Sequence, residues 1–232
     1  MIHEKKPLVL IPGFMLDETL WDDFIKVYPP ERTLCCASLS QGNSLAEMAA
    51  VITEKLPERF ILAGFSLGGY VARAIAEATP ERVAGMILIA TSLREDSPRQ
   101  RALMDAASLT ALSGDFRGIS YGALKQSLHP QLHNNKALLG RIREMGKRLG
   151  SKVFRTQSML ERGEITIRKI TCPVLIIAAR EDKLRSLSEA AELSELFQCP
   201  IEIIEGCGHM IPLEKPQELA QAIANWLKDT DL

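Results

Sequence analysis

The apolar residues of this chain gather in six short, nearly continuous runs, and the segments between most of them show an apolar face at helical spacing. Short continuous apolar runs are typical of strands buried on both faces of a parallel sheet. They predict strands at residues 7–12, 33–38, 59–64, 82–90, 173–179 and 200–206. The intervening segments predict helices at residues 18–27, 44–56, 67–78, 187–196 and 216–229. Because alternating strands and helices form right-handed βαβ units, we expect an α/β protein with a doubly wound parallel sheet.

One long interval breaks this alternation. Between residues 91 and 170 no clear strand pattern occurs, and the segment is rich in Leu, Met, Ala, Arg and Lys. Seven glycines interrupt it, so it predicts several short helices inserted between two strands. The chain then divides into a core of residues 1–91 and 171–232 and a helical insertion of residues 92–170.

The strand predicted at residues 59–64 runs into the sequence Gly-Phe-Ser-Leu-Gly-Gly, and a helical pattern starts at once. Ser66 therefore falls at the carboxyl end of a parallel strand, the edge at which such sheets bind ligands. A sharp strand-to-helix turn strains the backbone of its serine and needs small residues two positions before and after it. Gly64 and Gly68 meet this need. The pattern indicates a nucleophile, with an ordinary connecting turn as the alternative.

A serine hydroxyl needs a base, and the base needs a group that orients it. His209 lies in a glycine-flanked loop directly after the last predicted strand, at the same edge of the sheet as Ser66. Asp182 follows the strand at residues 173–179 and reaches that edge too, with Glu181 beside it as the second choice of acid. The order Ser66, Asp182, His209 is the order found in α/β-hydrolases.

Four pieces of the sequence carry a family resemblance that extends over nearly the whole chain. They are LVLIPGFMLDETLW near the start, GFSLGG around Ser66, AARED before Lys183 and GCGHMIPLEKP around His209. With these pieces in this order, the chain resembles the α/β-hydrolase superfamily, and most of all its esterase, lactonase and acyl-carrier-protein methyl-ester esterase branch. The resemblance implies that Ser66 is the nucleophile, His209 the base and Asp182 the orienting acid. It also implies that residues 92–170 form a helical lid.

An oxyanion hole made of backbone N–H groups is a further implication of the resemblance. The donors would be Leu67, which follows the nucleophile, and Phe14 in the loop after the first strand, with Met15 as the alternate. Side chains are irrelevant to this role because the backbone donates.

The sequence departs from the family pattern in two places. Many relatives have His-Gly in the loop after the first strand, where this chain has Pro-Gly, and only six residues precede the strand at residues 7–12. We therefore expect the α/β-hydrolase fold with about six parallel strands, without the usual first two of the eight-stranded sheet.

Charge is distributed unevenly between core and insertion. The net charge of −1 gives no indication of nucleic-acid binding. Residues 93–170 contain 15 Lys and Arg against 7 Asp and Glu, a net charge of +8, which leaves −9 for the rest. Two interpretations follow: the basic insertion attracts an anionic substrate or an acyl carrier protein, or it is a solvated helical surface attracted to its own acidic body.

Three further patterns bear on location and cofactors. No window reaches the roughly 20 apolar residues of a membrane span, so no membrane association is expected. The five cysteines are odd in number and lack C-x-x-C spacing, which favours a reduced, cytoplasmic protein. No H-E-x-x-H motif occurs, and the expected chemistry requires neither a metal nor an organic cofactor.

Together these patterns predict a serine carboxylesterase that cleaves a small or medium ester through an acyl-enzyme. An enol-lactonase, a thioesterase, a carbon–carbon hydrolase or a lyase would use the same residues, and a ligand receptor on this fold is the alternative from another class. Candidates for contacting the substrate, each with packing in the core or lid as the alternative role, are Met15, Phe65, Phe116, Tyr121 and Met159.

Overall fold

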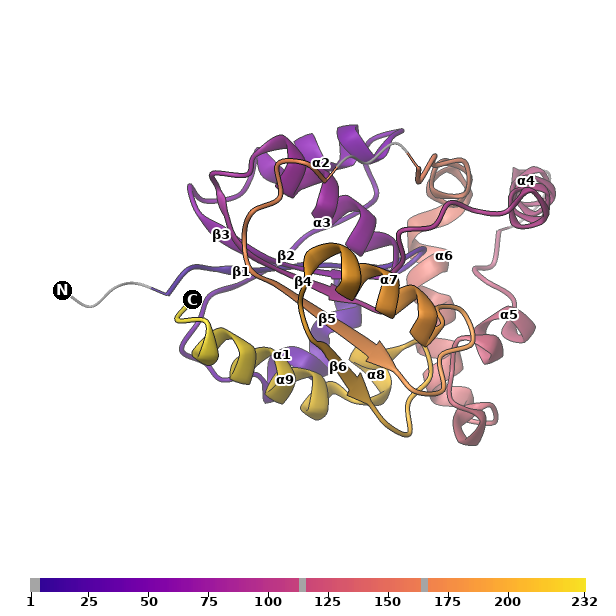
Figure 1. Ribbon diagram of the computed structural model, residues 1–232. Coiled ribbons are helices and arrows are strands. Elements are labelled where there is room, and N and C mark those ends of the chain that lie inside the picture. The colour runs from indigo at the N-terminus through magenta and orange to yellow at the C-terminus, as the bar shows by residue number, and fades with distance from the viewer. Residues whose placement is uncertain (1–4, 113–115, 164–166) are drawn as a thin grey trace.

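The computed structural model describes residues 5–112, 116–163 and 167–232, and at its centre lies a sheet of six parallel strands (Figure 1). The strands are β1 (Leu8–Ile11), β2 (Leu34–Cys36), β3 (Phe60–Phe65), β4 (Val83–Ile89), β5 (Val174–Ala179) and β6 (Ile201–Ile204). Their order is β2-β1-β3-β4-β5-β6. The predicted α/β class and the six strands are thus confirmed. β2 is added on one side of β1, and β3 to β6 follow on the other side. The strand order therefore reverses between β1 and β3, and sheets of this kind bind ligands at such a switch point.

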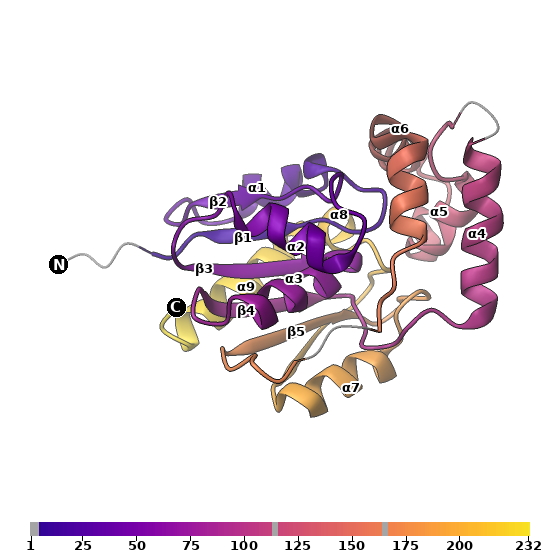
Figure 2. The same cartoon turned by 90° about the horizontal axis from the view of Figure 1, so that it is seen from above.

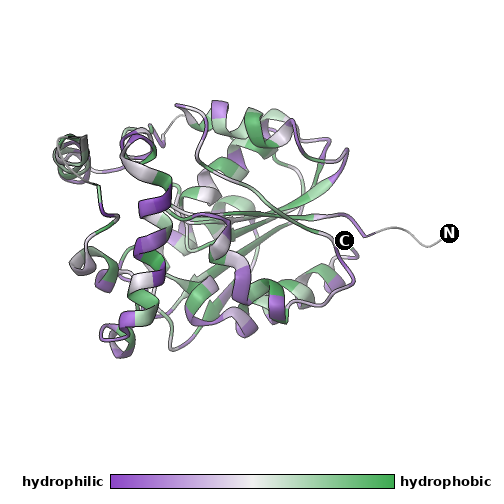
Figure 3. Ribbon diagram, turned by 180° about the vertical axis from the view of Figure 1, so that it is seen from behind, coloured by the Kyte–Doolittle hydropathy of each residue, from purple (hydrophilic) through white to green (hydrophobic). Residues whose placement is uncertain are grey.

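Helices cover both faces of the sheet, because successive strand residues point to opposite faces. In β1, Leu8 and Leu10 belong to one apolar cluster, whereas Val9 and Ile11 belong to the other. The first cluster packs against α1 (Asp22–Val27) and α9 (Pro216–Asp229). The second packs against α2 (Leu45–Thr53), α3 (Leu67–Ala78) and α7 (Leu187–Phe197). Figure 3 shows the resulting distribution: the strands are mostly green, and purple segments lie on the surrounding helices.

Two of the predicted helices have different limits in the structure. The segment at residues 18–27 starts as a 3-10 turn, η1 (Glu18–Trp21), because Asp17 accepts the Thr19 N–H at 3.1 Å and caps this turn before α1 begins. The helix expected to reach residue 56 ends at Thr53, a few residues before Pro57. A short helix that was not predicted, α8 (Ile211–Glu214), follows β6.

The insertion stands beyond the carboxyl ends of the strands, with α6 nearer the core and α4 outermost (Figure 2). Its elements are α4 (Pro98–Leu112), α5 (Tyr121–Gln126), the 3-10 turn η2 (Pro130–Leu132) and α6 (Lys136–Ser158). The several predicted helices are present, although α4, with 15 residues, is longer than expected. The 23 residues of α6 form two helical segments that meet at a kink. Gly140 and Gly146 continue α6, and only Gly150 (φ 81°, ψ 174°) kinks it. Within the described residues, no helix combines the length and apolarity needed to cross a membrane.

Candidate active site

Ser66 lies at an abrupt turn, since β3 ends at the preceding residue and α3 begins at the following one. Its backbone has φ 51° and ψ −112°, a conformation that costs a non-glycine residue roughly 1–3 kcal/mol. Two hydrogen bonds hold it there. The Ser66 N–H donates to the Ile89 carbonyl at 2.8 Å, and the Thr91 hydroxyl donates to the Ser66 carbonyl at 2.7 Å. The end of β4 thus fixes the position of the serine.

Two glycines allow the close packing of this turn. A Cβ on Gly64 would lie 2.4 Å from the Gly68 carbonyl oxygen, and one on Gly68 would lie 2.5 Å from the carbonyl oxygens of Ile11 and Pro12. Both distances are too short for any side chain. The start of α3 therefore rests directly on the backbone that leaves β1, and this contact brings the two loops at the switch point together.

A continuous line of hydrogen bonds joins Ser66, His209 and Asp182. His209 Nε2 lies 3.0 Å from Ser66 Oγ, and His209 Nδ1 lies 2.7 Å from Asp182 Oδ2. The other carboxylate oxygen, Oδ1, accepts the backbone N–H groups of Leu184 at 2.7 Å and Arg185 at 2.9 Å. An ionised carboxylate only accepts, so Nδ1 must carry the proton, and Nε2 of the neutral ring is free to accept the serine proton.

The loop that carries His209 is fastened by two further carboxylates. Glu181 accepts the Cys207 N–H at 2.9 Å and so supports the histidine loop from outside, whereas Asp182 contacts the imidazole itself. Glu214 accepts three backbone N–H groups: Gly208 at 3.2 Å, Met210 at 3.1 Å and His129 of the insertion at 2.8 Å. The residues on both sides of His209 are therefore held by one side chain.

Two backbone N–H groups are candidates for stabilising a negative oxygen. Within the described chain, the N–H groups of Phe14 and Leu67 have no hydrogen-bond acceptor. The alternate donor, the Met15 N–H, is already engaged, because it donates to Gln157 Oε1 at 2.8 Å. Leu67 is the first residue of α3, so its N–H also lies at the positive end of the helix dipole.

The chain matches the model of the alpha/beta hydrolase family over residues 8–222. This chain belongs to the alpha/beta hydrolase family. A pimeloyl-[acyl-carrier protein] methyl ester esterase of Nitrosomonas europaea is 25% identical to this hydrolase over 237 residues, which cover 91% of each chain. The esterase of the same name from Pectobacterium carotovorum is 40% identical over 93 residues, 37% of this chain and 36% of that protein. The solved enol-lactonase of Burkholderia xenovorans LB400 shares the fold, with a TM-score of 0.81, 14% identity and coverage of 98% of this chain and 94% of that one.

The five predicted substrate-contacting residues lie in different surroundings in this hydrolase. Phe65 is fully buried, with its ring centroid 5.1 Å from that of His209, and Met15 is 1% exposed. Both side chains pack in the interior, which is the alternative role given for them, and their contact with a substrate stays a prediction. Phe116 is half-buried, while Tyr121 and Met159 are exposed.

An aromatic row connects the loop after β1 with the insertion of this hydrolase. The ring of Phe14 lies 5.6 Å from that of Phe154 in α6, and Phe154 lies 5.1 Å from Phe116. Phe116 in turn lines a hollow of about 500 Å³ together with Arg117, Arg143, Glu144 and Lys147. Apart from Phe116, the lining side chains are charged, and three of the four are basic.

Part of the basic charge of the insertion is paired with the acidic core. Arg141 forms an ion pair with Asp23 and donates to the Thr19 carbonyl at 2.8 Å. Arg148 pairs with Asp17 at 2.6 Å. The side chain of Arg141 lowers the pKa of Asp23 below its usual value, and Lys26 assists. These arginines therefore follow the second interpretation, in which the basic insertion is attracted to the acidic core of its own chain.

One further group near His209 has little chemical activity of its own. Cys207 is fully buried two positions earlier, and burial raises the pKa of its thiol well above the usual value. A thiol in this state is protonated and a poor nucleophile. No cluster of three or more His, Cys, Asp and Glu side chains placed to hold a metal ion occurs in the described part of the chain.

Proposed function

We propose that this hydrolase cleaves carboxylic esters by acyl transfer, with Ser66 as nucleophile, His209 as general base and Asp182 as orienting acid. The observation that carries the proposal is the hydrogen-bonded line through these three side chains, which begins at a serine held in a strained turn. A serine hydroxyl becomes a useful nucleophile when such a base lies within hydrogen-bond reach.

The reaction follows from the positions of these groups. Ser66 Oγ attacks the ester carbonyl while His209 Nε2 takes its proton, and Asp182 stabilises the resulting imidazolium. The N–H groups of Phe14 and Leu67 hold the negative oxygen of the tetrahedral intermediate, a contribution of about 2.7–4 kcal/mol for one such donor. His209 then protonates the leaving alcohol, and water releases the acid from Ser66 by the reverse sequence. No step requires a metal or a cofactor.

An ester is the preferred substrate class because relatives that align over most of the chain include pimeloyl-[acyl-carrier protein] methyl ester esterases. The acyl group would be small or medium in size. Residues 92–170 would form a lid over the carboxyl edge of the sheet. All five cysteines are free thiols, which supports a reducing, cytoplasmic location.

An anionic substrate or an acyl carrier protein is the partner that the remaining basic side chains support. Three exposed basic side chains of the insertion have no carboxylate partner among the described residues: Arg117, Lys152 and Arg155. Replacing these three by serine should reduce the salt dependence of kcat/KM for an anionic ester and leave that for a neutral ester unchanged. Equal salt dependence of the two esters in the unmodified protein would exclude electrostatic attraction of the substrate.

Labelling with a fluorophosphonate, followed by peptide mass spectrometry, tests the proposed function. We expect a phosphonyl group on Ser66 in the unmodified protein and none in His209→Ala, while both proteins unfold at similar temperatures. Label on another residue, or equal label in His209→Ala, would contradict the proposed roles. Panels of simple esters, enol-lactones and thioesters then decide which bond is cleaved fastest.

A further inference from the structure

Gln157 is a fully buried polar side chain of α6 that connects two loops of the core. Its Oε1 accepts the Met15 N–H at 2.8 Å, and its Nε2 donates to the Leu39 carbonyl at 3.0 Å. The orientation of the amide is fixed by chemistry, because the Leu39 carbonyl can only accept and must face the NH₂ group. The accepting oxygen therefore faces Met15.

The loop that Gln157 contacts is a tight turn of residues 13–16, closed by the Leu16 N–H donating to the Gly13 carbonyl at 3.3 Å. Met15, its third residue, has φ 53°, while Phe14 is not among the residues with positive φ. This is the pattern of a type II turn, which favours glycine at the third position. A methionine there is strained, so the turn needs an outside contact to keep the peptide between Phe14 and Met15 in this orientation.

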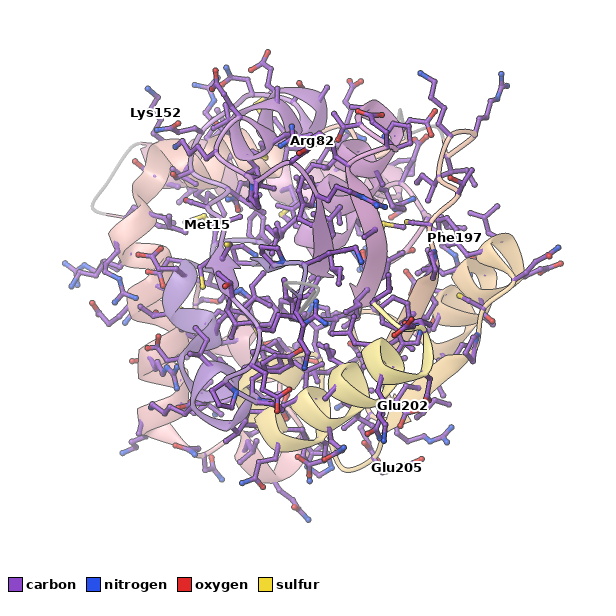
Figure 4. The ribbon with its side chains drawn as sticks, turned by 90° about the vertical axis from the view of Figure 1, so that its left-hand side faces the viewer. Met15, Arg82, Lys152, Phe197, Glu202 and Glu205 are labelled. Carbon is purple, nitrogen blue, oxygen red and sulfur yellow. The ribbon has the colours of Figure 1, made fainter. Side chains whose placement is uncertain are left out.

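Gln157 supplies this contact. It accepts the N–H of that central peptide, which in the alternative type I turn would point the other way and leave the buried Gln157 Oε1 without a donor. The same turn carries the Phe14 N–H, one of the two donors proposed for the oxyanion. Figure 4 shows Met15 in the interior beside α6, whereas Lys152 of the same helix projects at the edge of the molecule.

We propose that Gln157 is a positioning residue: through the Met15 N–H it holds the 13–16 turn in the conformation in which the Phe14 N–H serves the oxyanion. The helical insertion thereby completes the active site from outside the core. This inference rests on the proposed function, since it assigns Gln157 a part in the same acyl transfer.

Three variants test the role. Gln157→Leu removes the acceptor and the donor at nearly equal volume, and Gln157→Glu keeps an acceptor for Met15. Ser158→Ala is the matched control, because Ser158 is buried in the same helical turn but donates only to the Phe154 carbonyl of its own helix. The measurements are kcat and KM for a simple ester, the unfolding temperature, and hydrogen exchange of the peptide that contains residues 13–16.

For Gln157→Leu we expect kcat to fall about 10- to 100-fold with KM changed less than about threefold, because the oxyanion contact acts in the transition state. Exchange of the Met15 amide should become faster. The activity of Gln157→Glu, as a fraction of the unmodified activity at the same pH, should rise as the pH falls. A protonated carboxyl can again donate to the Leu39 carbonyl. Ser158→Ala should keep kcat within about threefold, because it does not touch the turn.

An unchanged kcat in folded Gln157→Leu, or an equal loss of kcat in Ser158→Ala, would overturn the positioning role. If Gln157→Leu does not fold, the test rests on Gln157→Glu. An activity of this variant that stays the same fraction of the unmodified activity at every pH would then overturn the positioning role. Absence of turnover and of Ser66 labelling in the unmodified protein would overturn the proposed function. In that case, the exchange of Met15 would still show whether Gln157 holds the turn.

Discussion

Asp182 reaches His209 with one carboxylate oxygen, at 2.7 Å from Nδ1, while its other oxygen accepts two backbone N–H groups. This division of the carboxylate decides which ring nitrogen of His209 carries a proton. The backbone donors leave Asp182 a single orientation, and in that orientation Nε2 faces Ser66 as an acceptor.

Asp182→Asn should abolish most of the activity without unfolding the protein. The two backbone N–H groups will select the amide oxygen, so the amide NH₂ will face Nδ1 and drive the ring proton to Nε2. We expect kcat to fall about 10³- to 10⁴-fold with a small change in KM. Steady-state kinetics check this, with Glu181→Gln as control, because glutamine at 181 still accepts the Cys207 N–H. Similar losses in both variants would show that the loop, and not the ring proton, is affected.

Phe14→Pro offers a direct test of the oxyanion donor. Proline is favoured at the second position of a type II turn, so it fits the 13–16 turn, yet it has no N–H. We expect kcat to fall about 10²- to 10³-fold. Phe14→Ala retains the N–H and loses the packing of the ring against Phe154 and the second apolar cluster, so its kcat should be affected much less. Equal kcat values for the two variants would remove Phe14 from the oxyanion hole.

Glu214 should make stability depend on pH in a recognisable way. Burial raises the pKa of this carboxyl, although three backbone N–H groups oppose the shift. A raised pKa in the folded state stabilises the fold below the unfolded pKa, and this contribution is lost as the pH rises through the folded pKa.

Glu214→Gln cannot titrate at this position. The difference in unfolding free energy, unmodified protein minus variant, should therefore be larger near pH 4 than near pH 8. Urea unfolding of both proteins across this range measures the difference, and the effects of all other groups cancel. Because the amide NH₂ leaves at least one backbone N–H unpaired, the variant should also lose about 1–3 kcal/mol near neutral pH. A difference that is constant, or that grows with pH, would contradict the raised pKa.

Arg141→Gln should weaken the attachment of α6 to the core. Arg141 pairs with Asp23 and lowers its pKa, and both side chains are about one-third exposed, so the expected loss of stability is about 0.5–1 kcal/mol at pH 7. A lowered pKa means that the stabilisation is present above the unfolded pKa of Asp23 and disappears as the pH falls through the folded pKa. Thermal unfolding at pH 7 and pH 3 checks both parts. Arg155→Gln, at an exposed position without a described carboxylate partner, should change neither.

The sequence was sufficient to predict the six strands and to bring Ser66, Asp182 and His209 to one edge. Continuous apolar runs define buried parallel strands, and the ends of those strands meet whatever their distance in the chain. The helices of the insertion were harder to predict. Gly140 and Gly146 suggested interruptions, but Gly146 continues the helix where α6 passes close to the backbone of Met15.

Gln157 and Glu214 could not be identified as site residues from the sequence. A single polar residue in a helical pattern usually faces solvent, and the contact of Gln157 joins residues 142 positions apart. Glu214 belongs to a matched family segment, but nothing in that segment shows that its carboxylate accepts three backbone N–H groups. Both roles depend on backbone atoms, which have no sequence signature.

The burial of the Gln157 amide between two core loops limits how freely the insertion can be exchanged. Because one fold can host different functions through the site built on it, a different helical segment grafted onto this core would be a direct way to alter substrate preference. In this chain such a chimera would retain Ser66, His209 and Asp182 but would lose the acceptor of the Met15 N–H. Core and insertion must therefore change together. A grafted segment with a glutamine amide at the position of Gln157 should keep the 13–16 turn in place, and a segment without one should not.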